Sequence, residues 1–297
     1  MFTNQNTFIQ IFIAKIINKI MTCKVKSPAF TLVELGVVLT IIAMGIGLLS
    51  LGNSLVYKYK LKTVMEDFTR FTRAYVSFKD IYKAVPGDMF NATTAFGATA
   101  PSGLAVQNGN GNGFIGMGTV ENVEMFAGFQ HLSLAGLING EYTGTYTLVS
   151  TVPSFPQSRY YSQAGYSFAS STCPACGIQF FNPAFSNNTY FNFIYMNAPV
   201  AVAGSYTWAA WWQVFVNGAM RAPDAQALDI IYDDGYPSTG SFLTSVPNNS
   251  PNGTGHCINY SVVPYIYAAQ GNTVGNTTYN PLQYTCIVAV VLDQHNL

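Results

Sequence analysis

One carboxylate, Glu34, stands at the start of a long apolar stretch and is the first candidate for chemistry in this chain. Residues 35–56, which follow it directly, contain no charged side chain. An ionised carboxylate beside so much apolar surface is costly unless a cation or hydrogen-bond donors compensate it. We therefore expect Glu34 to pair with the amino-terminal ammonium of a neighbouring chain packed alongside. The alternative is that Glu34 has no such partner and that its side chain only extends to the polar boundary of an apolar layer.

Four cysteines in the second half of the chain are the next reactive groups: Cys173, Cys176, Cys257 and Cys286. In an oxidising compartment an even number of cysteines favours disulfides. Three pairings are open, and we favour Cys173 with Cys176 and Cys257 with Cys286, since the second bridge would fix the carboxyl-terminal strand. A redox centre at the Cys-Pro-Ala-Cys motif is the alternative, but β-prone residues follow where a helix would be needed. Zinc held by four thiolates is disfavoured because there is one Cys-x-x-Cys motif.

Two polar segments have spacings related to calcium loops. Asp229, Asp233 and Asp234 could supply oxygen ligands, but calcium takes about six to eight of them and this segment offers few. A solvated Asp-Asp-Gly turn is the alternative. Residues 108–113 read Asn-Gly-Asn-Gly-Asn-Gly, with neutral amides at the ligand positions, and predict a flexible loop. We expect no cofactor, and structural calcium at the aspartates is the alternative.

The remaining candidates for catalysis or binding have no pattern typical of an active site. The histidines are His131, His256 and His295, and no serine lies in a nucleophile-elbow motif. A group of tryptophans, Trp208, Trp211 and Trp212, could bind a sugar or a partner, although core packing is the more frequent role of such side chains. We therefore do not expect an enzyme.

A single long helix is predicted to carry Glu34. The apolar stretch 35–56 exceeds the roughly 20 residues needed to cross a bilayer core of about 30 Å, which predicts a membrane span. The first 29 residues contain basic residues and no acidic ones, so the positive-inside tendency places the bulk of the chain outside. Apolar residues then recur at three- and four-residue steps up to about Lys83, where Pro86 ends the helix. The second half is thus an amphipathic helix.

The rest of the chain is rich in Gly, Asn, Tyr and Thr and is predicted to be dominated by strands, among them 142–149, 192–195 and 285–292. Short helices are expected at 121–138 and 214–228, and a strand, an acidic turn and a second strand at 230–240. The expected fold class is α+β. Its long amino-terminal α-helix, half transmembrane and half amphipathic, packs on a β-rich globular head with an antiparallel sheet.

Composition limits the range of partners. Charged residues make up 9 % of the 297 residues and the formal net charge is zero. Four of the thirteen basic residues precede Ala29, so the remainder holds nine basic against thirteen acidic residues. Such a chain has no basic patch for nucleic acid, and we expect none to bind.

The segment Ser27-Pro28-Ala29 followed by FTLVEL resembles the processing site of type IV pilins and of the pseudopilins of type II secretion. The resemblance implies that a prepilin peptidase cuts between Ala29 and Phe30 and methylates the new amino group of Phe30. Glu34 is then the fifth residue of the mature chain. Ala29 stands where the family usually has Gly. Translation from Met21 instead of Met1 would give a shorter leader and the same mature chain.

Three further blocks are similar to one subgroup of prepilin-type proteins: YKAVPGDMFNATTAFG, QHLSLAGLINGEYTG and DIIYDDGYPSTG. The implied regions are a leader (1–29), a transmembrane and filament-core helix (30–57), a stalk helix (58–84) and a periplasmic head (85–297). The implied function is a structural subunit of a type II secretion pseudopilus, stored in the bacterial inner membrane with its head in the periplasm. A minor type IV pilin for adhesion, motility or DNA uptake is one alternative, and a membrane-tethered enzyme or binding protein is another.

The resemblance also implies partners. These are like subunits and other pseudopilins or pilins, the prepilin peptidase, an inner-membrane platform protein with its assembly ATPase, and the lipid bilayer.

Overall fold

The computed structural model describes residues 31–116, 124–145, 152–161, 164–170, 189–197, 218–245, 257–259, 266–267, 273–274, 277–278 and 286–296. The chain divides into two compact units, Met1–Val56 and Tyr57–Leu297. Of the first unit, the structure describes residues 31–56.

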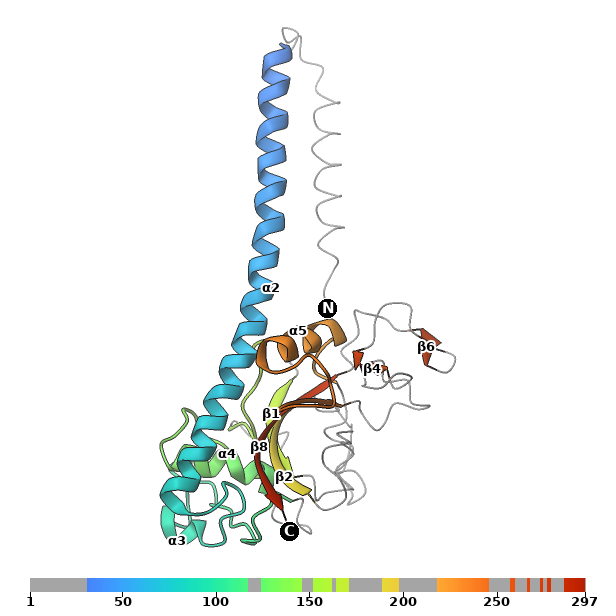
Figure 1. Ribbon diagram of the computed structural model, residues 1–297. Coiled ribbons are helices and arrows are strands. Elements are labelled where there is room, and N and C mark those ends of the chain that lie inside the picture. Colours follow the sequence, from blue (N-terminus) through green and yellow to red (C-terminus); the bar gives the residue numbers. More distant parts are fainter. Residues whose placement is uncertain are drawn as a thin grey trace. The chain divides into compact units, whose positions relative to one another are not determined.

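Helix α2, Leu32–Tyr82, begins in the first unit and ends in the second (Figure 1). Both of its ends have local causes. Thr31 accepts the first helical hydrogen bond, from the backbone amide of Leu35 at 3.2 Å. After Tyr82, Lys83 has a φ of 53°, the left-handed conformation that ends many helices. Pro86 then prevents further helical growth. The observed bounds lie close to the helix expected from the sequence.

The transmembrane half that was expected in this helix is a wrong prediction. Across the residues that the structure describes, no helix has both the length and the apolar character needed to cross a membrane. A crossing needs about 20 consecutive apolar residues. What holds of the expected fold class is α+β, with helices beside a small antiparallel sheet.

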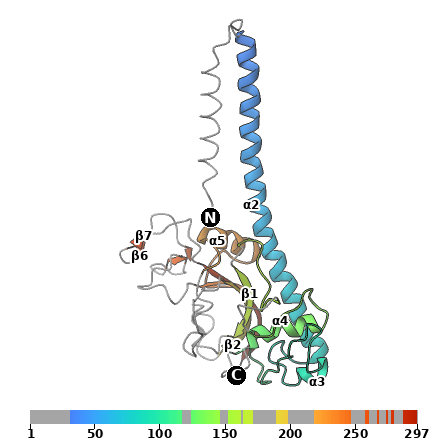
Figure 2. The ribbon, with the colours of Figure 1, turned by 180° about the vertical axis from the view of Figure 1, so that it is seen from behind.

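The main sheet has four antiparallel strands in the order β1-β2-β8-β3 (Figures 1 and 2). Their bounds are Gly165–Ser170 for β1, Thr189–Asn197 for β2, Ile287–Asn296 for β8 and Phe242–Ser245 for β3. The strands expected at 192–195 and 285–292 thus correspond to β2 and β8. Two short pairs complete the described strands: β4 with β5, Ile258–Asn259 and Ile266–Tyr267, and β6 with β7, Thr273–Val274 and Thr277–Thr278.

Among the described residues, three short helices accompany the sheet: α3, Ala92–Phe96, α4, Glu124–Leu134, and α5, Ala222–Tyr232. Helix α4 contacts β1 at one edge of the sheet, and α5 contacts β3 at the other edge. The helix expected at 121–138 corresponds to α4. The strand expected to begin at residue 230 is wrong, because α5 continues to Tyr232 and the following strand, β3, begins at Phe242. Pro223, at the start of α5, suits a first helical turn.

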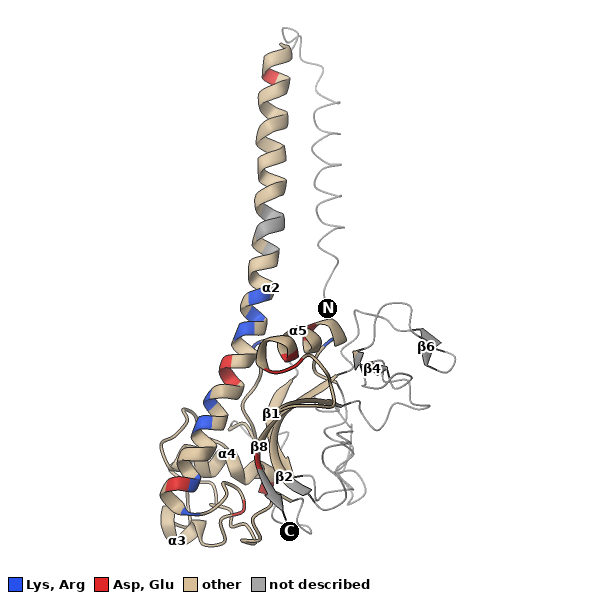
Figure 3. Ribbon diagram, viewed as in Figure 1, with Lys and Arg blue, Asp and Glu red and all other residues tan. Residues whose placement is uncertain are grey.

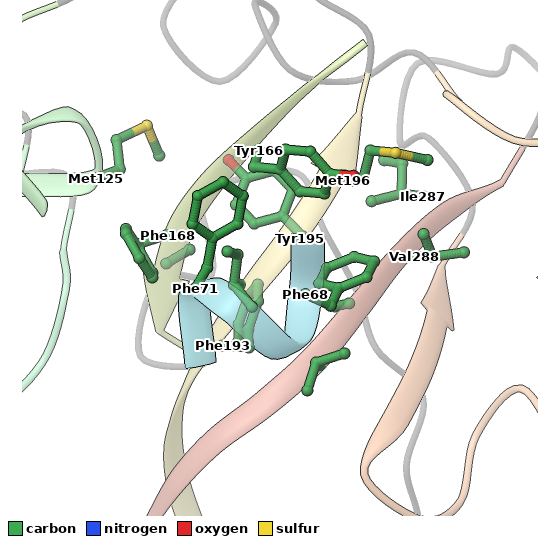
Figure 4. Close-up of a cluster of buried hydrophobic side chains, with 14 of the residues drawn as sticks. Phe68, Phe71, Met125, Tyr166, Phe168, Phe193, Tyr195, Met196, Ile287 and Val288 are labelled. Atoms are coloured by element: carbon green, nitrogen blue, oxygen red, sulfur yellow. The ribbon is translucent and has the colours of Figure 1, made fainter. Parts of the chain in front are cut away.

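The core of the second unit lies between α2 and the sheet (Figure 4). Four aromatic side chains of α2 that the helical spacing assigned to one stripe are fully buried: Phe68, Phe71, Tyr75 and Phe78. The Tyr166 ring of β1 lies 5.3 Å from that of Phe68 and 5.2 Å from that of Phe71, between ring centroids. Burying large aromatic side chains is a main source of stability in such a core.

Candidate functional site

The amino-terminal end of α2 brings Glu34 together with Thr31. One carboxylate oxygen, Glu34 Oε2, accepts hydrogen bonds from the Thr31 backbone amide and from its hydroxyl, both at 2.9 Å. In return, the Glu34 backbone amide donates to Thr31 Oγ1 at 3.2 Å. This reciprocal pattern is a capping box, which satisfies backbone amides at a helix start that have no helical partner. The bonds from the Thr31 amide and hydroxyl lower the pKa of Glu34 below its usual value.

The capping box gives Glu34 a partner that was not foreseen. The signal was present in the sequence, because Thr31-Leu32-Val33-Glu34 has the threonine and glutamate spacing of this motif. Within the described residues, hydrogen bonds engage only Oε2, so Oε1 remains available to a second group. The expected cleavage site, between Ala29 and Phe30, lies outside the described residues.

The part of α2 in the first unit exposes apolar side chains on all of its sides. Its most exposed members include Leu32, Met44 and Leu48, at 90 %, 70 % and 71 %. Figure 3 shows charge on this part of the helix only near its start, whereas the remainder of α2 carries many charged residues. A helix that is apolar on every side normally has partners around it. This surface therefore requires cover from outside the described part of the chain.

In the second unit, the turn Pro86-Gly87-Asp88 meets the asparagine- and glycine-rich loop 108–113. Asp88 Oδ1 accepts hydrogen bonds from the amides of Gly111, at 2.8 Å, and Asn112, at 3.1 Å. Its Oδ2 accepts one from the Gly113 amide at 2.7 Å. Asp88 is buried, and burial raises the pKa of its carboxyl. The loop expected to be flexible is thus tied to a buried carboxylate.

A second buried carboxylate, Glu124 at the start of α4, holds the same loop. Its Oε1 accepts from the Asn110 amide at 2.9 Å, and its Oε2 from the Gly116 amide at 2.7 Å. Burial raises the pKa of Glu124 to about 7, with a smaller contribution from the negative charge of Asp88. Neither Asp88 nor Glu124 has a sequence motif of its own that would single it out, because only the fold brings them to the loop.

His131, on α4, connects the turn to the loop from the other side. Its Nδ1 accepts a hydrogen bond from the Gly87 amide at 2.9 Å, and its Nε2 lies 2.7 Å from the Gln107 carbonyl oxygen. The ring is therefore neutral and carries its proton on Nε2. Burial lowers the pKa of His131 to about 4. A buried, neutral imidazole with a hydrogen bond at each ring nitrogen has a structural role here.

Gly87 shows how close the turn and α4 come. It has a φ of 95°, and a Cβ at this position would lie 2.3 Å from the Glu124 carbonyl oxygen. Any side chain here would have to displace the backbone of α4. Two blocks of the sequence resemblance, 82–97 and 130–144, thus contribute to one clamp. We use the term polar clamp for Asp88, Glu124, His131 and the backbone amides that they bind.

The three aspartates considered for calcium have separate structural roles. Asp229 is fully buried on α5, where it accepts hydrogen bonds from the Tyr267 hydroxyl at 2.7 Å and the Gly235 amide at 3.1 Å. Burial raises its pKa to about 7. Asp233 accepts from the Phe242 amide at 3.0 Å, and Asp234 from the Tyr236 amide at 2.9 Å. Asp229 is therefore not part of a solvated turn. Within the described ranges, no group of acids, cysteines and histidines is suited to hold a metal ion.

The favoured pairing of Cys257 with Cys286 is confirmed by a disulfide between them. Both cysteines are fully buried, and Cys286 also exchanges backbone hydrogen bonds with Met220, at 2.9 and 3.1 Å. The bridge ties the start of β8 to the segment before β4. Cys173 and Cys176 lie outside the described residues, as do Trp208, Trp211 and Trp212.

Comparison with known proteins gives no match to a family model, to a curated protein or to a solved structure.

Proposed function

We propose that this chain is a structural subunit of a type II secretion pseudopilus, assembled through the amino-terminal part of α2. The observation that carries the proposal is an apolar helix surface exposed on all sides, with a capped carboxylate at its start. Like helices packed side by side would cover this surface. The proposal also rests on the resemblance of residues 27–35 to prepilin processing sites.

Glu34 has a specific task in this assembly. Cleavage before Phe30 would create an ammonium group next to Thr31, and Oε1 of a neighbouring Glu34 could accept a hydrogen bond from it. Each charged group is costly alone among apolar helices, and pairing them offsets part of that cost. Because the pair forms at one axial offset, it would set the register between subunits. The capping box holds the carboxylate in place for this contact.

The proposed partners follow from this role. They are like subunits, the prepilin peptidase acting between Ala29 and Phe30, and a platform protein whose ATPase drives assembly. The Cys257–Cys286 disulfide supports an extracytoplasmic place for the second unit, because such bridges persist in oxidising compartments. The work of the subunit would be mechanical.

The proposal is tested by isolating sheared filaments from cells that produce the protein. Mass spectrometry should find an amino terminus at Phe30 carrying one methyl group. Glu34→Ala should abolish filaments while the protein still accumulates. Thr40→Val is the matched control, because Thr40 is a polar residue of the same apolar region whose hydroxyl, among the described residues, bonds to carbonyls of its own helix. An intact leader together with the absence of any polymer would refute the proposal.

A further inference from the structure

A groove of about 610 Å³ runs along the outer side of α2 in the second unit. Its apolar lining comes from Met65 and Ala74 of α2 and from Leu137, which follows α4. Three cationic side chains lie along it: Lys62, Arg70 and Arg73. We call this surface the cationic groove.

The charges of the cationic groove are only partly compensated within the chain. Lys62 lies 3.6 Å from Glu66, and both side chains are exposed. Arg70 lies 2.9 Å from Asp67. Arg73 is exposed, and the ion pairs found among the described residues do not include it. An acidic group from another molecule would therefore find an arginine ready to pair.

The far end of α5 has the complementary character. Ile230 and Ile231 are each 62 % exposed and Tyr236 is 42 % exposed. Asp233 and Asp234 lie between them in the chain, and both are exposed. We call residues 230–236 the acidic knob. Exposed apolar side chains of this size beside carboxylates suit a surface with an apolar lining and basic side chains.

The cationic groove and the acidic knob come from different elements of the second unit. The groove is lined by α2 and by Leu137, which follows α4, whereas the knob is formed by the end of α5 and the residues after it. A contact between two different patches of the same chain is heterologous, and it repeats from copy to copy. Such a contact closes into a ring or, where the rotation does not close, gives an open helical polymer like the proposed filament.

We propose that the acidic knob of one copy docks into the cationic groove of the next copy in the filament. The occupant is thus a second copy of this chain. Ile231 would cover Met65, Ala74 and Leu137, and the carboxylate of Asp234 would pair with Arg73. This inference rests on the proposed filament function and adds a contact between second units to the packing of the amino-terminal helices.

Hydrogen bonds hold the knob, because Asp229 accepts one from the Gly235 amide at 3.1 Å and Asp234 accepts one from the Tyr236 amide at 2.9 Å. The other end of α5 is held as well. Asp224, fully buried near the start of α5, receives two hydrogen bonds from Arg221, at 2.6 and 3.0 Å. The hydroxyls of Tyr57 and Tyr160 also donate to its carboxylate. A preorganised surface loses less entropy on docking than a loop would.

Cysteine crosslinking of the full-length protein in producing cells tests the contact. Thr69→Cys places a thiol in the groove and Ile231→Cys one on the knob, whereas Val76→Cys places one on an exposed part of α2 that does not line the groove. The Thr69→Cys, Ile231→Cys double variant should give a ladder of crosslinked oligomers. Each single variant should give none, and neither should Val76→Cys with Ile231→Cys.

A charge reversal adds a second readout in the double-cysteine background. Arg73→Glu should reduce the ladder about tenfold, because it places a carboxylate opposite Asp234. Lys60→Glu makes the same change in net charge at an exposed residue outside the groove and should leave the ladder unchanged.

The outcomes separate this contact from the filament function. Filaments without a ladder would overturn the contact and leave the filament proposal standing. A ladder in cells without filaments would support the contact and remove the proposed function, and the absence of both would overturn both. Dimers from Ile231→Cys alone would also overturn the contact, since like surfaces would then meet.

Discussion

Replacing Glu124 by glutamine isolates the cost of keeping a carboxylate in the polar clamp. Glutamine has nearly the same shape as the protonated carboxyl group but cannot ionise. Its one oxygen can accept from the amide of Asn110 or of Gly116, and its NH2 group leaves the other amide without the lone pair that the hydroxyl oxygen of the protonated acid retains. The variant therefore removes the titration of this side chain and adds a cost of about 1–3 kcal/mol that does not depend on pH.

The magnitude follows from the pKa of Glu124, which burial raises from 4.5 to about 7. Below pH 4.5 the carboxyl is protonated in both the folded and the unfolded chain. Between pH 4.5 and 7 the unfolded chain loses this proton while the folded chain keeps it, so the free energy of unfolding falls as the pH rises. At about 1.4 kcal/mol per pKa unit, the total loss above pH 7 is about 3 kcal/mol. Glu124→Gln should remove this loss.

The assay is urea unfolding of the purified protein, followed by circular dichroism at pH 4.5, 6 and 8. From pH 4.5 to pH 8 the stability of the variant should rise relative to that of the wild type by about 3 kcal/mol, because only the wild type loses stability through Glu124. The stability of the variant is compared with that of the wild type at each pH, because other groups titrate in both proteins. His131, whose pKa is lowered to about 4, makes both proteins less stable as the pH falls from 6.5 to 4.

The matched control is Glu141→Gln, which changes an exposed glutamate and should give the same stability difference at all three pH values. A stability difference between Glu124→Gln and the wild type that stays the same from pH 4.5 to pH 8 would refute the reasoning. The two amide hydrogen bonds to the ionised carboxylate would then offset the cost of burying it.

Two further predictions concern the ends of the described chain. Thr31→Val removes the hydroxyl bonds of the capping box and should destabilise the start of α2 by about 1 kcal/mol. The measurement is amide hydrogen exchange in the first turn of α2, which should become faster. Equal exchange rates in variant and wild type would contradict the capping role. Cys257→Ser with Cys286→Ser should lower the free energy of unfolding by about 2–4 kcal/mol, whereas an unchanged free energy of unfolding would contradict a stabilising role of this bridge.

The polar clamp shows why local sequence patterns were insufficient to predict the structure of part of the molecule. Asn-Gly repeats indicate backbone freedom, and an isolated segment of this kind would be flexible. In the folded chain its amides bind Asp88 and Glu124, which come from a turn 20 residues earlier and from a helix that follows. Likewise, Asp229 belongs to an apolar run that fits either a short strand or a helix. Contacts of α5 with β3 and β5 favour the helix.

The sequence by itself determined the long helix and its buried stripe, because helical spacing of Phe68, Phe71, Tyr75 and Phe78 is a local property. It also held the capping signal of Thr31 and Glu34 and favoured the Cys257–Cys286 bridge. The membrane-spanning half inferred from hydropathy was wrong. Only the tertiary structure decided the strand order β1-β2-β8-β3, the burial of Asp88, Glu124 and His131, and the groove that α2 forms with Leu137. These features depend on contacts between distant segments, and such contacts leave no period or spacing in a single sequence.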